Sequence, residues 1–230
     1  MQQAQYHPMF ANLQRRRCLV VGGGLIAQRK VTSLLKARAI VTVVSPRVTR
    51  RLMVAARDGR IRHVKRRFRP DDLRGVWLVY AATDEPRTNE LVFRTANDAR
   101  VFTNVVDQKA LCSFIAPAVL RRGSLAVAVS TGGASPSLAK QLRDQLGKQI
   151  DAGYPRLLRL LEGFRMRAQE ELPGYADRKR YFARLLHGPV PKLVRAGHMV
   201  RARQEARRLL NDLGLQRQDR ARFPSTQAAR

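Results

Sequence analysis

The sequence predicts an α/β protein: a doubly wound parallel sheet, then a small dimerisation segment, then an all-helical C-terminal domain. Three observations support this prediction. Apolar runs of strand length alternate with helical patterns up to residue 106, glycines directly follow the first run, and two adjacent strands and then helices alone come afterwards. The expected boundaries are 1–112, 113–150 and 151–215, with a disordered tail over 216–230.

The first apolar run, Cys18 to Val21, is typical of a strand buried on both faces. The pattern Gly22-x-Gly24-x-x-Ala27 follows it, which is the dinucleotide-binding fingerprint of Rossmann-type folds with alanine in the third place. Gly22 permits the tight turn, Gly24 lets a pyrophosphate approach, and Ala27 lets the helix pack on the strand. The N–H groups at the helix start are then free to bind the diphosphate. The alternative to a nucleotide site is a glycine turn that serves only tight packing of the chain.

The second strand, over residues 40–44, arrives at the distance expected of a strand–helix–strand unit. In such folds this strand commonly ends in an acidic residue that holds the ribose hydroxyls. This chain has Ser45, Pro46 and Arg47 there instead. Arg47 suits the 2′-phosphate of NADP, and it equally suits the adenine or the diphosphate of NAD.

Three further strands, over residues 61–64, 76–82 and 101–106, complete the predicted sheet. Helices are expected over residues 48–58 and 87–98. Ligands of open parallel sheets bind at the carboxyl ends of the strands. Thr83 and Asp84, after the fourth strand, are therefore candidate cofactor neighbours, with capping of the helix ahead of Pro86 as the alternative role. His63 alternates with apolar neighbours and is assigned a structural role.

The alternation of strands and helices ends after the fifth strand. Residues 114–123 and 124–130 are expected to form a hairpin, and the free edge of such a hairpin is a common place for dimerisation. A glycine-containing loop follows and leads into a helix that runs to about residue 150, with Leu138, Leu142 and Leu146 on one side. Glycines before a helix start form a second candidate anion site, or an ordinary capped turn.

The composition is strongly basic, with a net charge of +28 and 37 Arg against 8 Lys. Nucleic acid, a polyanionic small substrate, or an arginine-rich composition without a specific role would each account for it. No nucleic-acid-binding motif supports the first, so we do not favour it. No apolar run has the length of a membrane helix and the start lacks a signal peptide. Two distant cysteines form neither a disulfide framework nor a zinc pattern, so we expect a cytoplasmic protein without a resident metal.

Four motifs together carry a family resemblance. Besides the fingerprint, they are Tyr6-His7-Pro8-Met9-Phe10, Asn104-Val105-Val106-Asp107 and Ser130-Thr131-Gly132-Gly133-Ala134-Ser135-Pro136. Together with Thr83-Asp84 they resemble the precorrin-2 dehydrogenase/sirohydrochlorin ferrochelatase family, which includes the N-terminal part of siroheme synthase; the opening motif, the glycine fingerprint and the loop at 130–136 are shared with it in order and spacing. The resemblance covers about residues 6–215. No methyltransferase domain follows, so uroporphyrinogen methylation is not expected.

The resemblance implies a homodimer that oxidises precorrin-2 to sirohydrochlorin with NAD, and in many members inserts ferrous iron to give siroheme. It implies Asp107 as the catalytic residue, since a carboxylate there can accept protons from the macrocycle. Members of this family manage without the acidic ribose residue, which favours NAD over NADP. The alternative functions are a nucleotide-sensing regulatory domain and a basic nucleic-acid-binding protein.

The expected site residues fall into two further groups. The candidate cofactor-binding residues are Gly22, Gly24, Leu25, Ile26, Pro46, Arg47 and Thr83. The candidate tetrapyrrole-binding residues are Asn104, Ser130, Thr131 and Gly132. Arg121 and Arg122 are additional candidates for contact with the carboxylates of the macrocycle.

Overall fold

The computed structural model describes residues 6–222, with the side chains of residues 6–215. The chain divides into two compact units, and each is considered by itself. The first comprises residues up to 116 together with 131–135, and the second comprises 117–130 and 136 onward. The second unit therefore joins the hairpin and the helix after it to the C-terminal helices, whereas the sequence analysis assigned these to two separate domains.

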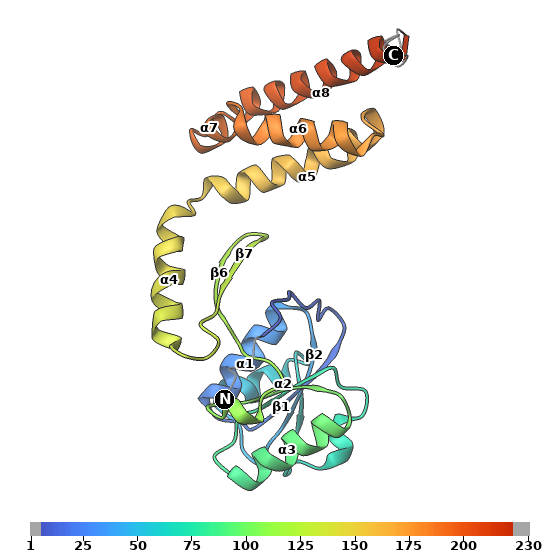
Figure 1. Ribbon diagram of the computed structural model, residues 1–230. Helices are drawn as coiled ribbons and strands as arrows, with labels where there is room; N and C mark the ends of the chain where they lie inside the picture. The colour runs from blue at the N-terminus through green and yellow to red at the C-terminus, as the bar shows by residue number, and fades with distance from the viewer. Residues whose placement is uncertain (1–5, 223–230) are drawn as a thin grey trace. The chain divides into compact units, whose positions relative to one another are not determined.

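The first unit contains a five-stranded parallel sheet in the order β3-β2-β1-β4-β5, of which Figure 1 labels the two strands β1 and β2. Its strands are β1 (Arg17–Val21), β2 (Ile40–Val44), β3 (Arg62–Val64), β4 (Leu78–Ala81) and β5 (Phe102–Val105). The helices between them are α1 (Leu25–Lys36), α2 (Arg50–Arg57) and α3 (Pro86–Asp98). The order of the strands confirms the predicted Rossmann-type sheet.

Both faces of this sheet are covered, as the apolar strands require. Alternate residues of β1 point to opposite faces, so Cys18 and Val20 join one core and Leu19 and Val21 join the other. Helices α1 and α2 close the first core, and α3 closes the second. Ala27 is fully buried in α1, and its small side chain lets the helix lie against the sheet.

The second unit begins with the antiparallel hairpin of β6 (Ala118–Arg122) and β7 (Leu125–Val129), joined at Gly123 and Ser124. Residues 114–117, predicted as strand, are not part of it. The peptide N–H of Phe114 donates to the carbonyl of Thr103, and its ring packs edge-on against Tyr80. This segment is therefore held to the parallel sheet, and the hairpin starts only beyond it.

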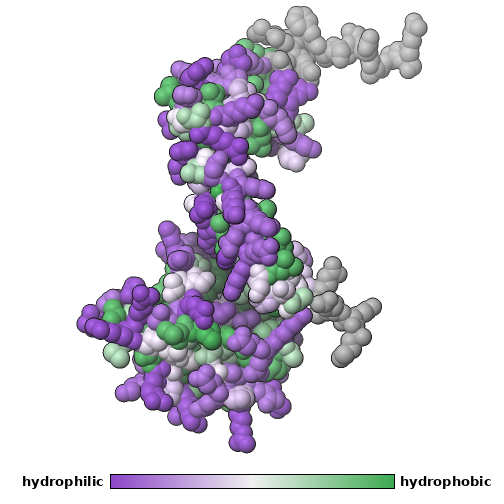
Figure 2. All heavy atoms as spheres, turned by 90° about the vertical axis from the view of Figure 1, so that its left-hand side faces the viewer, coloured by the Kyte–Doolittle hydropathy of each residue, from purple (hydrophilic) through white to green (hydrophobic). Residues whose placement is uncertain are grey.

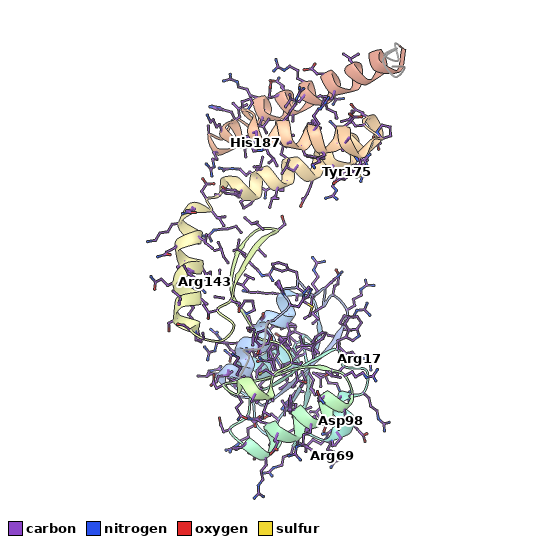
Figure 3. The ribbon with its side chains drawn as sticks, viewed as in Figure 1. Arg17, Arg69, Asp98, Arg143, Tyr175 and His187 are labelled. Carbon is purple, nitrogen blue, oxygen red and sulfur yellow. The ribbon has the colours of Figure 1, made fainter. Side chains whose placement is uncertain are left out.

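Five helices follow in the second unit: α4 (Pro136–Gln149), α5 (Gly153–Glu171), α6 (Tyr175–His187), α7 (Val190–Arg195) and α8 (Met199–Arg222). Helices α5 to α8 enclose their own core, at whose centre the fully buried Tyr181 donates its hydroxyl to the carbonyl of Ala206 at 3.1 Å. Figure 3 labels Tyr175 and His187 at the two ends of α6.

The last helix is longer than the sequence suggested. Helix α8 continues through residues 216–222, where a disordered tail was expected, and residues 223–230 lie outside the described part. Arginine and glutamine are good helix formers, so a polar composition alone does not end a helix. The face of the molecule drawn in Figure 2 is dominated by hydrophilic residues, in keeping with the charge of +28.

Candidate active site

The turn after β1 contains two glycines that the protein itself requires. Gly22 has φ +117°, and a Cβ on it would collide with the carbonyl oxygen of Ala82. A Cβ on Gly23 would collide with the carbonyl oxygen of Arg47. The segments after β1, β2 and β4 are thus packed together so closely that side chains cannot separate them.

Gly24 is different, because nothing lies within 4 Å of the place where its Cβ would be and its φ is an ordinary −77°. It is the N-cap of α1, no side chain caps the helix, and no acidic residue lies in the first turn. The unpaired N–H groups and the positive end of the helix dipole therefore face open space. A diphosphate fits there, since it needs donors and close backbone approach.

A single cavity of about 680 Å³ lies beside this helix start. All seven predicted cofactor residues line it: Gly22, Gly24, Leu25, Ile26, Pro46, Arg47 and Thr83. The side chain of Leu25 is 69% exposed, which leaves apolar surface for a flat ring. The sequence analysis missed Arg67, Phe68, Glu85 and Thr88, which also line the cavity. Arg67 and Phe68 come from the loop after β3, whose approach to the glycine turn no local pattern indicates, whereas Glu85 and Thr88 lie at the start of α3, directly after the predicted Thr83 and Asp84.

The loop after β2 has a defined shape without an acidic residue. The hydroxyl of Ser45 donates to the carbonyl of Arg47 at 2.6 Å, and Nε2 of His63 donates to the carbonyl of Ser45 at 2.9 Å. His63 thus has the structural role that was predicted. Within the described residues Arg47 forms no ion pair, so its charge remains available to the cavity.

Thr83 forms hydrogen bonds within its own turn and also lines the cavity. Its hydroxyl donates to the side-chain oxygen of Asn89 at 2.8 Å and accepts from the N–H of Glu85 at 3.2 Å. Asn89 in turn donates to the carbonyl of Thr83 at 3.0 Å. These bonds close the turn before α3 but do not cap the helix, because its N-cap is Glu85 and no side chain caps it; Thr83 also lines the cavity.

Asp107 lies just beyond the carboxyl end of β5 and its side chain is exposed. Its φ is +59°, in the left-handed region that non-glycine residues rarely adopt. The N–H of Gln108 donates to the carbonyl of Val105 at 3.3 Å and closes the turn around it. This turn presents the carboxylate at the carboxyl edge of the sheet, opposite the amino edge that Arg17 marks in Figure 3.

The predicted tetrapyrrole residues differ in their surroundings. Asn104 is 8% exposed, and its amide donates to the carbonyl of Phe114 at 3.0 Å, so it fastens that segment to β5. Thr131 stabilises its own loop, since its hydroxyl donates to the carbonyl of Ser135 and accepts from the N–H of Ser135, both at 3.0 Å. Gly132 has φ +62° and open space where a Cβ would be. Ser130 is exposed and ends the strand side of the loop.

Lys109 connects three of the sequence motifs within the first unit. Its ammonium lies 6.0 Å from the ring centroid of Tyr6, and a Cβ on Gly133 would lie 3.2 Å from its Cδ. Lys109 itself follows Asp107 by two residues. The N-terminal motif, the turn of Asp107 and the glycine loop at 131–135 are therefore neighbours in the fold.

Among the side chains of residues 6–215, no group of three or more His, Cys, Asp or Glu is placed to hold a metal ion. Over the same part of the chain, no helix combines the length and the apolar composition that crossing a bilayer requires.

Comparison with known families matches three parts of the chain. A model described as putative NAD(P)-binding matches residues 9–118, a model for the central part of sirohaem biosynthesis proteins matches 122–149, and a model for the sirohaem synthase dimerisation region matches 153–210. The term dimerisation region thus applies to the C-terminal helices, whereas the sequence analysis gave it to 113–150.

Individual relatives agree with these matches. The chain is 42% identical over 214 residues to the siroheme synthase of Thioalkalivibrio sulfidiphilus, covering 93% of this chain and 44% of the relative. It is 40% identical over 207 residues to that of Methylobacillus flagellatus, covering 90% and 44%. The chain thus spans less than half the length of these relatives. The solved structure of SirC, a precorrin-2 dehydrogenase, matches with a TM-score of 0.74 at 25% identity, covering 90% of this chain and 98% of that one.

Proposed function

Because the chain belongs to the family of precorrin-2 dehydrogenases and the N-terminal parts of siroheme synthases, we propose that it oxidises precorrin-2 to sirohydrochlorin in siroheme biosynthesis. The oxidant is NAD, which accepts one hydride from the macrocycle. One proton leaves with it, so the products are sirohydrochlorin, NADH and a proton.

One observation carries the proposal: the glycine turn and Asp107 lie at the same edge of the sheet. In the strand register Val21 pairs with Ala81 and Ala81 pairs with Val105, so the carboxyl ends of β1, β4 and β5 are level. Neighbouring strands lie about 4.8 Å apart, which puts the ends of β1 and β5 roughly 10 Å from each other. A nucleotide whose diphosphate sits on Gly24 can therefore extend its nicotinamide toward Asp107.

Different residues of the chain would bind the cofactor, accept the proton and contact the substrate. The N–H groups at the start of α1 bind the diphosphate, and Leu25 and Ile26 offer apolar contact to the rings. Arg47, which has no acidic partner among the described residues, would face the ribose or the phosphates. The Asp107 carboxylate accepts the proton that leaves the macrocycle. Asn104 acts by positioning its loop, and the loop of Ser130, Thr131 and Gly132 would contact the tetrapyrrole.

We extend the proposal to ferrous iron as a second substrate. Inserting iron into sirohydrochlorin removes two protons from the pyrrole nitrogens, and we assign their acceptance to the Asp107 carboxylate. The tetrapyrrole nitrogens would bind the metal, so the protein needs no metal site of its own. Both reactions would then use one proton acceptor on the same macrocycle.

We also propose a homodimer. Helix α4 buries only Ala139, while Leu138, Leu142 and Leu146 are 45, 38 and 37% exposed. Leucines at this spacing form one stripe, and a partner would cover it. The dimerisation segment at 113–150 stays part of the proposal, together with the helices at 153–210 that the family model names. Two free cysteines fit the reducing cytoplasm as the proposed location.

The test is to incubate the pure protein with precorrin-2 and NAD and to follow the absorption spectrum with and without ferrous iron. We expect NADH and sirohydrochlorin to appear together, and siroheme to appear when iron is added. NAD binding without any oxidation would favour the nucleotide-sensing alternative. Absence of NAD binding, with tight and salt-dependent binding of nucleic acid, would favour the alternative of a basic nucleic-acid-binding protein.

A further inference from the structure

Helices α5 and α8 border a groove of about 680 Å³ in the second unit. Both helices belong to the same core, and the floor of the groove is apolar: Leu160 and Phe164 are buried, and Met199 is half-buried. Gly163 also lines the groove, and nothing lies within 4 Å of the place where its Cβ would be. The volume is within the range of about 300–1,000 Å³ that is usual for small-molecule sites.

Arginine is concentrated around this groove. Five of its ten lining residues are arginine, whereas the whole chain has 37 in 230 residues, so the general arginine bias does not account for them. Among the described residues, no aspartate or glutamate lines the groove. The five arginines come from both helices: Arg156, Arg159 and Arg167 on α5, and Arg203 and Arg207 on α8.

These arginines lack acidic partners. Within the part of the chain whose side chains the structure describes, none of the five forms an ion pair. Nε of Arg156 is buried and has no hydrogen-bond partner there, and a buried donor left unpaired is costly. The guanidinium of Arg167 lies 5.7 Å from the ring centroid of Phe164, so one of the charges is close to the apolar floor. Like charges around one groove repel one another, and a bound anion relieves that repulsion.

We propose that this groove binds a polycarboxylate with a flat apolar body, and that its ligand is the tetrapyrrole of the proposed reaction. The apolar ring system lies on Leu160, Phe164 and Met199. The arginines pair with the carboxylates at its edge, since a guanidinium matches a carboxylate with two parallel hydrogen bonds. The choice of a tetrapyrrole rests on the proposed function, whereas the polycarboxylate class rests on the groove itself.

Two other occupants fit the groove less well. A second copy of this chain carries the same net charge of +28, so it would bring further positive charge to the arginines. A single strand of nucleic acid is commonly held by several stacking aromatic rings, and Phe164 is the one aromatic side chain among the described residues that line the groove. A tetrapyrrole, with carboxylates around an apolar macrocycle, matches both the floor and the arginines.

The first test measures binding without cofactor or turnover. The probe is uroporphyrin III, a stable porphyrin with carboxylate side chains on every pyrrole ring, and its fluorescence anisotropy gives the affinity. Arg159→Gln/Arg203→Gln should weaken a binding event by about 10-fold or more, because two charged hydrogen-bond donors are lost. The matched control is Arg165→Gln/Arg201→Gln, which removes the same charge from exposed positions of the same helices outside the groove. It should leave the affinity nearly unchanged.

The second test changes the shape of the groove and keeps its charge. Gly163→Phe places a ring in the open centre, and it should fold, since phenylalanine has a higher helix propensity than glycine and no atom lies within 4 Å of its Cβ. It should weaken uroporphyrin binding by about 10-fold or more, because ring and ligand cannot occupy the same space. Gly214→Phe is the control, since Gly214 also has open space at its Cβ but does not line the groove.

The stability of the charge variant separates binding from packing. If the arginines repel one another in the free protein, Arg159→Gln/Arg203→Gln should unfold at the same or a higher urea concentration than the wild type at low salt. A lower urea midpoint would overturn the argument from repulsion, because it would show that these side chains support the packing of the helices.

The remaining outcomes decide between the occupants. Unchanged uroporphyrin affinity in both Arg159→Gln/Arg203→Gln and Gly163→Phe would overturn the site, and an equal loss in the control Arg165→Gln/Arg201→Gln would show only the attraction of the net charge. Displacement of uroporphyrin by a single-stranded oligonucleotide, with loss of oligonucleotide binding in Gly163→Phe, would assign the groove to nucleic acid instead. A wild type that binds uroporphyrin in the groove but does not oxidise precorrin-2 would remove the proposed function and keep the polycarboxylate site.

Discussion

Gly23 packs directly against the backbone of Arg47, so that a Cβ at position 23 would collide with the Arg47 carbonyl oxygen. One residue later, at Gly24, the same Cβ would meet nothing within 4 Å. Two adjacent glycines of one fingerprint thus have different reasons to be glycine. At Gly23 the reason is the fold, and at Gly24 we attribute it to the ligand.

This contrast gives the first prediction. Gly23→Ala should destabilise the protein by about 2 kcal/mol or more, because the loop after β2 must move to accept the methyl group. Gly24→Ala should leave stability within about 0.5 kcal/mol of the wild type, since its φ and its surroundings accept a side chain. Urea unfolding of the two variants measures the difference. Equal losses of unfolding free energy in the two variants would contradict the difference in surroundings between Gly23 and Gly24.

The second prediction separates folding from cofactor binding at the same place. Gly24→Asp should fold at least as stably as the wild type, because aspartate is a preferred N-cap and α1 has no side-chain cap. It should nevertheless lower NAD affinity by about 100-fold or more and abolish oxidation, since its charge would face the diphosphate. Calorimetric titration with NAD gives the affinity. Normal NAD affinity in this variant would show that the diphosphate does not bind at the start of α1.

The third prediction concerns Asp107. Asparagine tolerates the left-handed conformation, so Asp107→Asn should keep its stability, whereas Asp107→Ala should lose about 1 kcal/mol. Both should form NADH at a rate reduced by about 10²-fold or more, the usual range for a lost acid/base group. Iron insertion, followed by its spectral change, should fall in parallel. Near-normal rates would contradict the role of Asp107, and loss of one reaction alone would show that the two use different groups.

The fourth prediction tests the stripe on α4. Leu142→Asp places a charge among exposed leucines that a partner would cover, so it should convert the dimer into a monomer at micromolar concentration. Met53→Asp is the control, because Met53 is also exposed, at 60%, but lies on α2 of the first unit. Sedimentation velocity measures the state of association. A wild-type monomer, or a variant that remains dimeric, would count against the stripe as part of the interface.

The fifth prediction concerns alkaline pH. Burial raises the pKa of Cys18 from 9.0 to about 11. Between these values the unfolded thiol loses its proton while the folded thiol keeps it, so stability present below pH 9 is lost as the pH rises toward 11. From pH 8 to pH 10 the wild type should lose about 1 kcal/mol more than Cys18→Val, which cannot titrate. Urea midpoints at the two pH values provide the comparison, and parallel losses would show that Cys18 does not contribute.

Most of the first unit could be predicted because its signals are local. The glycine fingerprint, the buried strands and the residues that follow them lie within short stretches, and all predicted cofactor residues meet in one cavity. Arg67 and Phe68 could not be predicted there, because their place depends on how a loop crosses the sheet edge. The role of Asn104 in fastening Phe114 is likewise a tertiary contact, 10 residues apart, without a pattern of its own.

The second unit was less predictable for a physical reason. Helical spacing identifies the stripe of Leu138, Leu142 and Leu146, but spacing cannot tell a stripe that faces the chain's own core from one that does not. The structure leaves these leucines about two-fifths exposed, where a core position would bury them. The predicted disorder after residue 215 is wrong up to residue 222, because a segment of good helix formers can be polar and still continue a helix.

The left-handed turn at position 107 restricts which side chains natural variation can use there. Asparagine and glycine accept that backbone but have no carboxylate, and glutamate has one but is disfavoured in the left-handed region. Aspartate alone satisfies both demands. If Asp107 has the role proposed above, a member of this family with asparagine or glycine at this position should keep the turn and the nucleotide cavity and should bind NAD without oxidising the substrate, and a single base change is enough to produce it.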